Sequence, residues 1–169
     1  MKKNHKAPIV CGTDFSATAT EAVDITAALA RRLETRLLLV HVDQLPRSLV
    51  SDPIIIESAA LQTRRELDHE VQRLRDLGTD IEGKIVAGSA FDQLVTAATN
   101  AKARLIVIGA VGHGLGRRLL VGSVAERTAE SSPIPTLVMR PGGRLASWVR
   151  DEAKLRVLVG YDFSAASDA

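Results

Sequence analysis

The part of the sequence best suited to chemistry is a glycine-rich stretch at residues 109–123. It holds five glycines in fifteen residues, between an apolar run and a segment with helical spacing. Glycines let a backbone approach a ligand closely, and the first turn of a helix presents free amides and the positive end of its dipole. Ser123 adds a hydroxyl at the start of that turn. These features favour binding of an anionic group such as phosphate.

Neither of the two common phosphate-binding motifs is present in this stretch. A dinucleotide motif G-x-G-x-x-G that starts at Gly112 requires a glycine where Arg117 stands, and no G-K-S/T occurs. An alternative without a ligand is also open, because Ser123 and Glu126 have the spacing of a helix capping box. The number of glycines favours a ligand site over a purely structural loop.

Other polar side chains stand near the ends of apolar runs. Asp14 follows such a run and precedes a helical segment, so its carboxylate could cap that helix or contact a ligand or metal ion. His41 lies inside an apolar run, and we expect a sheet histidine without a chemical role. Arg117 and Arg118 could neutralise phosphate charge or lie on the loop surface, and the second interpretation is favoured.

Composition indicates one globular domain and argues against nucleic acid and membranes as partners. The 169 residues are 46% hydrophobic and 25% charged, with a formal net charge of +2. A single Trp and a single Tyr offer few rings for stacking bases, and no apolar stretch is long enough to cross a bilayer. The lone Cys11 has no disulfide partner in the chain, so we expect a buried, unreactive thiol in a cytoplasmic protein.

Strand-like and helix-like segments alternate along the first 141 residues. Apolar runs predict strands at 9–11, 37–42, 105–108 and 136–139, and the less apolar segment 81–87 predicts one more. Capping residues predict helices that begin near Thr18, Asp52, Ser89 and Ser123. The alternation predicts a mainly parallel sheet with helices on both faces, and such sheets bind ligands beyond the carboxyl ends of their strands.

The segments at these strand ends resemble one family. The series Gly109-x2-Gly112-x9-Gly122-Ser123 is similar, without a gap, to the ATP-binding signature G-x2-G-x9-G-S/T of universal stress proteins. Segments 12–16, 39–42 and 122–126 also resemble that family, and the likeness covers residues 8–140. It implies a Rossmann-like, adenine-nucleotide alpha-hydrolase-like α/β fold, with a doubly wound five-stranded parallel sheet of order 3-2-1-4-5. It also implies an ATP binder that is usually dimeric.

The resemblance implies a set of nucleotide contacts as well. Asp14 would face the ribose or a Mg²⁺ ion, Val42 would bind adenine through its backbone, and Ile108 would line the base. The residues that would complete the site are Thr13, Gly109, Gly112, His113, Gly122, Ser123 and Val124. One departure is Val111, which stands where many members carry His, with His113 displaced beyond Gly112.

The function expected from these features is ATP-dependent regulation in a stress response. Efficient phosphoryl transfer needs a placed lysine, metal ligands and a group that positions water. The loop region offers only Asp14, Arg117 and Arg118 as candidates, so we expect at most slow hydrolysis. An alternative of another class is a nucleotide-free dimerisation or interaction module whose glycine loop is structural.

The end of the sequence repeats its beginning. Residues 155–164 repeat the pattern of residues 7–16, with Gly-x-Asp-Phe-Ser in both. This repeat predicts a universal stress protein domain at 1–141, a linker at 142–154 and the first strand of a truncated second domain at 155–169, as in a tandem member. We expect the strand to pair with an exposed sheet edge, in an exchanged homodimer or with a second tandem domain.

Overall fold

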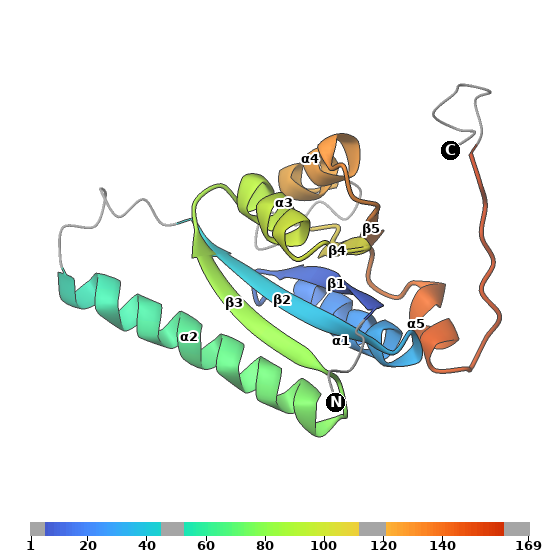
Figure 1. Ribbon diagram of the computed structural model, residues 1–169, viewed down its shortest axis with the longest axis horizontal. Coiled ribbons are helices and arrows are strands. Elements are labelled where there is room, and N and C mark those ends of the chain that lie inside the picture. The colour runs from blue at the N-terminus through green and yellow to red at the C-terminus, as the bar shows by residue number, and fades with distance from the viewer. Residues whose placement is uncertain (1–5, 45–52, 112–120, 161–169) are drawn as a thin grey trace.

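Five parallel strands form the centre of the molecule, in the order β3-β2-β1-β4-β5 (Figure 1). The structure is a computed structural model that describes residues 6–44, 53–111 and 121–160. The strands are β1 (Lys6–Thr13), β2 (Thr35–Asp43), β3 (Ile81–Ala87), β4 (Leu105–Gly109) and β5 (Thr136–Met139). All four neighbouring pairs are parallel, so the predicted sheet and its strand order are confirmed.

Helices cover both faces of this sheet (Figure 1). On one face lie α1 (Ala17–Arg32), α2 (Pro53–Asp76) and α5 (Arg144–Val149), and on the other lie α3 (Ala90–Asn100) and α4 (Ser123–Ser131). Among the residues that the structure describes, no helix is long and apolar enough to span a membrane.

The central strand β1 shows why the apolar runs predicted strands well. Ile9, Val10 and Cys11 are all fully buried. Successive side chains of a strand point to opposite faces, so Ile9 and Cys11 enter the core under α1 and α2, while Val10 enters the core under α3 and α4. A strand covered on both faces must be apolar at consecutive positions.

The helix starts differ from some of the capping predictions. α1 begins after Ser16, whose hydroxyl accepts a hydrogen bond from a first-turn amide at 3.2 Å, so the expected cap at Thr18 is wrong. Ser89 is the N-cap of α3, but its side chain makes no capping bond. Pro53 begins α2 as predicted, and its expected cap, Asp52, lies outside the described residues.

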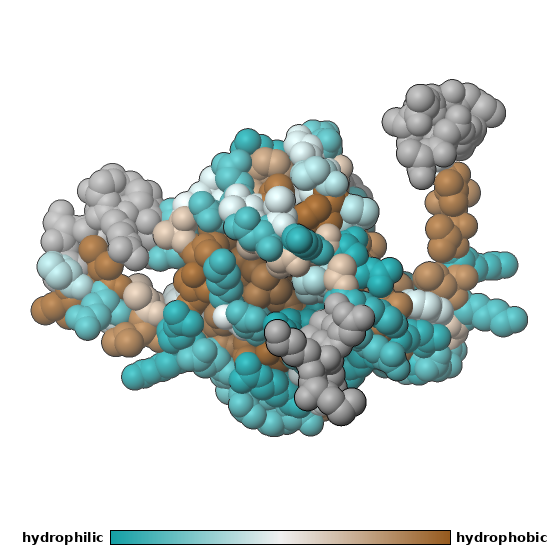
Figure 2. Space-filling model, viewed as in Figure 1, coloured by the Kyte–Doolittle hydropathy of each residue, from teal (hydrophilic) through white to brown (hydrophobic). Residues whose placement is uncertain are grey.

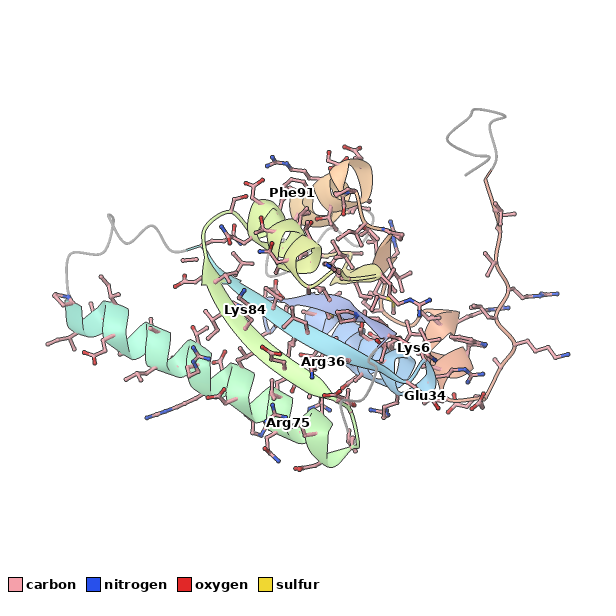
Figure 3. All side chains as sticks on the ribbon, in the orientation of Figure 1. Lys6, Glu34, Arg36, Arg75, Lys84 and Phe91 are labelled. Carbon is pink, nitrogen blue, oxygen red and sulfur yellow. The ribbon has the colours of Figure 1, made fainter. Side chains whose placement is uncertain are left out.

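The amino-terminal end of the sheet carries exposed ion pairs (Figure 3). Lys6 Nζ lies 3.8 Å from a carboxylate oxygen of Glu34, and Arg36 lies 3.7 Å from Asp80 and 3.6 Å from Glu82. Exposed pairs of this kind contribute little to stability, typically below about 1 kcal/mol each. This end is therefore a solvated surface, and the carboxyl ends of the strands, where open α/β sheets bind ligands, lie at the opposite end.

After β5 the chain forms α5 and then an extended tail. α5 lies against α1, where the Arg32 guanidinium stacks over the Trp148 ring at 4.5 Å and also pairs with Asp151. The predicted linker 142–154 thus contains an ordered helix. Within the described ranges, residues 155–160 pair with no strand. Their apolar side chains are exposed, Leu158 by 97%, and form the brown column at the right of Figure 2.

Candidate functional site

A cavity of about 460 Å³ opens at the carboxyl ends of β1, β2 and β4. The sheet continues from β1 to β2 on one side and from β1 to β4 on the other, so the cavity lies where the strand order reverses. This is the position at which open α/β sheets bind ligands, and the volume falls in the range of about 300–1,000 Å³ typical of small-molecule sites.

Eight of the ten residues that the resemblance assigns to a nucleotide line this cavity. They are Thr13, Asp14, Val42, Ile108, Gly109, Gly122, Ser123 and Val124. The other two, Gly112 and His113, lie outside the described residues, as do Arg117 and Arg118. The structure therefore brings together strand ends and a helix start that are far apart in the sequence.

The inner wall of the cavity is apolar. Val40, Leu94 and Ile108 are buried side chains that line it, and they come from β2, α3 and β4. Two of these side chains pack closely over Gly12 of β1. A Cβ added to Gly12 would lie 3.2 Å from Ile108 Cγ2 and 3.3 Å from Leu94 Cδ2. Sequence reasoning assigned no cavity role to Val40 or Leu94, whose apolar character indicated only the core.

Asp14 is the only charged side chain among the lining residues that the structure describes. It lies in the turn between β1 and α1, where its Oδ1 accepts a hydrogen bond from the backbone N of Ser16 at 3.0 Å. The Thr13 hydroxyl accepts one from the backbone N of Phe15 at 3.1 Å. Asp14 therefore orders the turn before α1 and also lines the cavity, but the N-cap of α1 is Ser16, so the expectation that Asp14 caps this helix is wrong.

The start of α4 forms another part of the cavity wall. Gly122 is the N-cap, and it has no side chain that could accept a hydrogen bond from the first-turn amides. Ser123 lies inside the first turn, so the alternative capping box with Glu126 is wrong. A helix start without a side-chain cap, placed at a cavity, is suited to binding an anionic group through its backbone N–H groups.

The two ends of the glycine loop meet at this wall. The backbone N of Gly122 donates to the carbonyl oxygen of Ala110 at 2.7 Å, and Ala110 N donates to Met139 O at 2.7 Å. A Cβ added to Gly122 would lie 3.3 Å from that Ala110 oxygen. Gly122 has a φ of −68°, so the glycine is needed for close approach and not for an unusual backbone conformation.

No metal cluster accompanies the cavity in the ranges 6–44, 53–111 and 121–160. These ranges hold no group of three or more His, Cys, Asp or Glu side chains that could bind an ion. A metal ion in the cavity would therefore depend on Asp14 and on oxygen atoms of the ligand itself.

Cys11 is buried as expected, and burial raises the pKa of its thiol from 9.0 to about 12.

Comparison with known proteins agrees with the fold. A universal stress protein of Thermus aquaticus is 28% identical over 135 residues, which are 78% of this chain and 97% of the relative. A solved universal stress protein in complex with cAMP has a TM-score of 0.62 at 28% identity, over 80% of this chain and 98% of that one.

A second solved structure is the universal stress protein of Archaeoglobus fulgidus in complex with dAMP. Its TM-score is 0.59 at 26% identity, over 79% of this chain and 97% of that chain. The family model described as the universal stress protein family matches residues 7–140. Since this match spans most of the sequence, the chain belongs to the universal stress protein family.

Proposed function

We propose that this protein binds ATP in the cavity at the carboxyl ends of β1, β2 and β4, and that it acts as a cytoplasmic, nucleotide-dependent regulator in a stress response. The observation that carries the proposal is the start of α4, where Gly122 and Ser123 present an uncapped helix end to a cavity with an apolar inner wall. An apolar wall suits a planar base, and a helix start suits phosphate. Two relatives of known structure are complexes with the adenine nucleotides cAMP and dAMP.

The lining residues divide between the parts of the nucleotide. Val42 and Ile108, which line the cavity, would contact adenine. Gly109, Gly122 and Ser123, with Val124, would contact the ribose and phosphates. Asp14 would hold the ribose hydroxyls or a Mg²⁺ ion. Mg²⁺ in nucleotide sites is held by one or two carboxylates together with phosphate oxygens, so a single aspartate fits this role.

Hydrolysis at this site would be slow. Asp14 is the only charged group among the described lining residues, and none of those residues is a lysine. Phosphoryl transfer depends on charge stabilisation and on a group that positions water. The bound state of the nucleotide, more than its turnover, would then carry the regulatory signal.

The alternative function is that of a dimerisation or interaction module without a nucleotide. One observation favours an association role of some kind, namely the exposed apolar residues Val157, Leu158 and Val159. Association through the tail is compatible with an occupied or an empty cavity, so it does not decide between the two functions. Calorimetric titration of the full chain with ATP and Mg²⁺ separates them: binding supports the proposal, and no binding at millimolar ATP supports the alternative.

A pair of matched glycine variants tests where ATP binds. Gly122 and Gly143 are both helix N-caps, with φ and ψ of −68° and 149° in one and −70° and 151° in the other. A Cβ on either would lie 3.3 Å from a backbone oxygen, of Ala110 and Arg140 respectively. The local strain is therefore equal, but only Gly122 lines the cavity.

We expect Gly122→Val to weaken ATP binding at least about tenfold, equivalent to about 1.4 kcal/mol, because its side chain would force the loop ends apart. Gly143→Val should bind ATP like the wild type, and both variants should unfold cooperatively. Equal affinity in Gly122→Val and the wild type would place the nucleotide elsewhere.

A further inference from the structure

A histidine outside the cavity contacts the turn that carries Asp14. β1 and β2 are in register at Thr13 and His41, but β1 ends there while β2 continues to Asp43. The last carbonyl of β1, that of Thr13, lies 2.9 Å from Nδ1 of His41. A carbonyl oxygen can only accept, so Nδ1 must carry the proton and donate it in this hydrogen bond.

The same imidazole supports the residue on the other side of Asp14. The rings of Phe15 and His41 are stacked, with centroids 4.6 Å apart and planes inclined by 24°. Phe15 has a φ of 61°, in the left-handed region that bulky residues rarely adopt. Such a conformation persists only where its surroundings stabilise it. Here the surroundings include the His41 ring and the Thr13 hydroxyl, which accepts the Phe15 amide.

We propose that His41 is a positioning residue of the nucleotide site. It holds the residue before Asp14 by a hydrogen bond and the residue after it by ring stacking, and so fixes the direction of the Asp14 carboxylate into the cavity. Its effect on affinity rests on the proposed function. Its effect on the geometry of the turn does not, because that geometry is present without a ligand.

Three substitutions separate the two contacts. His41→Asn keeps an amide N–H at the place of Nδ1 but loses the ring. His41→Phe keeps the ring but loses the donor, and His41→Leu loses both and serves as a second variant without a donor. A merely space-filling histidine would be replaced best by Phe, whereas a positioning donor would be rescued by Asn.

The first test uses the protein without nucleotide. The amides of Phe15 and Ser16 are bonded within the turn, and the Gly78 amide, bonded to Arg75 O after α2, is an internal reference. We expect hydrogen exchange at Phe15 and Ser16 to rise at least about tenfold in His41→Phe and His41→Leu and less in His41→Asn, with Gly78 unchanged. Wild-type exchange at both turn amides in either donor-free variant overturns the proposal.

A measurement on the unaltered protein guards against variants that fail to fold. Nitrogen-15 NMR at a pH where the imidazole is neutral should show Nδ1 of His41 protonated and Nε2 unprotonated. The opposite tautomer would contradict the hydrogen bond to Thr13, and with it the positioning role.

The last test connects His41 to the ligand. We expect His41→Phe to lower the affinity for ATP with Mg²⁺ at least about fivefold, and expect little further loss when Asp14 is already Asn. Losses that add fully in the double variant would show that His41 does not act through Asp14. If the wild type binds no ATP, the proposed function fails, while the exchange and NMR results still decide whether His41 positions the turn.

Discussion

At the scale of single residues, Asp14 is held in place by the fold before any ligand arrives. Its Oδ1 accepts the Ser16 amide at 3.0 Å, and the flanking residues Thr13 and Phe15 are fixed by their own contacts. A group that is already ordered loses less conformational freedom when a ligand binds. The carboxylate is also the only charge among the described residues that line the proposed site, so its effect on affinity should depend on the metal ion.

Asp14→Asn tests that dependence, because asparagine keeps an oxygen that can accept the Ser16 amide but carries no charge. We expect the affinity for ATP with Mg²⁺ to fall about tenfold, since the ion loses its protein ligand. Affinity measured with EDTA should fall less or rise, because a carboxylate without a metal ion repels phosphate. Calorimetric titration under both conditions gives the comparison. An unchanged response to Mg²⁺ would leave Asp14 with only its role in the turn.

The buried thiol of Cys11 should make the free energy of unfolding depend on pH in the alkaline range. Burial raises the pKa of its thiol to about 12, against a smaller opposite effect of the hydrogen bond from Thr26. Between the unfolded pKa of 9.0 and the folded pKa of about 12, the unfolded state releases a proton that the folded state retains. The stabilisation is therefore complete below pH 9.0 and is lost progressively as pH rises through this window.

Urea unfolding of the wild type and of Cys11→Ala checks this sign. Between about pH 8 and about pH 10 we expect the wild type to lose about 1 kcal/mol more free energy of unfolding than the variant. The tyrosine and the lysines titrate in both proteins, so their contribution cancels in the difference. Parallel pH dependences in the two proteins would mean that the thiol ionises as readily in the folded state as in the unfolded chain.

At the scale of elements, two serine N-caps differ in their bonding. The Ser16 hydroxyl accepts the Ala19 amide at 3.2 Å, whereas Ser89 stands at the same position of α3 with no side-chain capping bond. We expect Ser16→Ala to lower the free energy of unfolding by about 1 kcal/mol and Ser89→Ala to change it by less than about 0.5 kcal/mol. Urea unfolding of both variants measures the contrast, and equal losses would show that the 3.2 Å bond does not stabilise α1.

The strands were predictable from the sequence, and the helix starts were less so. The predicted strands at 81–87 and 136–139 have the bounds of β3 and β5. β5 is a short, mostly apolar run, whereas β3 is an edge strand in which the exposed Glu82 and Lys84 alternate with less exposed residues. Capping spacing occurs at several residues near each helix start. At α1 the turn with Phe15 at a φ of 61° places Ser16, not Thr18, at the N-cap.

The residues that line the cavity were likewise only partly predictable from the sequence. A resemblance at strand ends and at the glycine loop predicted eight lining residues, because they lie in or directly beside the segments that resemble the family. Leu94 lies outside those segments, and the apolar character of Val40, although it lies within 39–42, indicated only the core. The contact between His41 and Thr13 joins residues 28 positions apart, and it depends on the register of β1 and β2. No local pattern in the sequence encodes that register.

At the scale of the whole molecule, the tail has the sequence of a central strand but lacks the surroundings of one. Residues 155–160 repeat the pattern of β1, which is paired with β2 on one side and β4 on the other. Val157, Leu158 and Val159 are 73%, 97% and 77% exposed. Burying such side chains stabilises by roughly 1.5–3 kcal/mol each, so association is favoured. In a tandem protein, a second domain would supply the burial.

Among the residues that the structure describes, β5 is an edge strand of the sheet, and its outer edge offers a partner for this strand. Next to β5 lies a groove whose walls include the apolar side chains Leu137, Met139, Leu145 and Leu155, so the tail begins at the groove itself. Strand addition to a free sheet edge satisfies backbone hydrogen bonds and buries alternate side chains. We therefore expect two copies to exchange tails, each placing residues 157–159 along β5 of the other.

Leu158→Glu tests the exchange, because a charge at the most exposed of the large apolar residues in the described part of the tail would oppose burial between two chains. We expect the wild type to be a dimer and the variant a monomer at micromolar concentration, measured by sedimentation velocity. Leu77→Glu is the matched control, since Leu77 is also exposed, by 57%, but follows α2 outside the groove, and it should leave the dimer intact. Deletion of 155–169 should reproduce the monomer while α5 stays anchored by Arg32 and Trp148. A dimer that survives both changes with wild-type stability would show that the tail takes no part in assembly, and a wild type that stays monomeric would show that the strand finds no partner in a second copy.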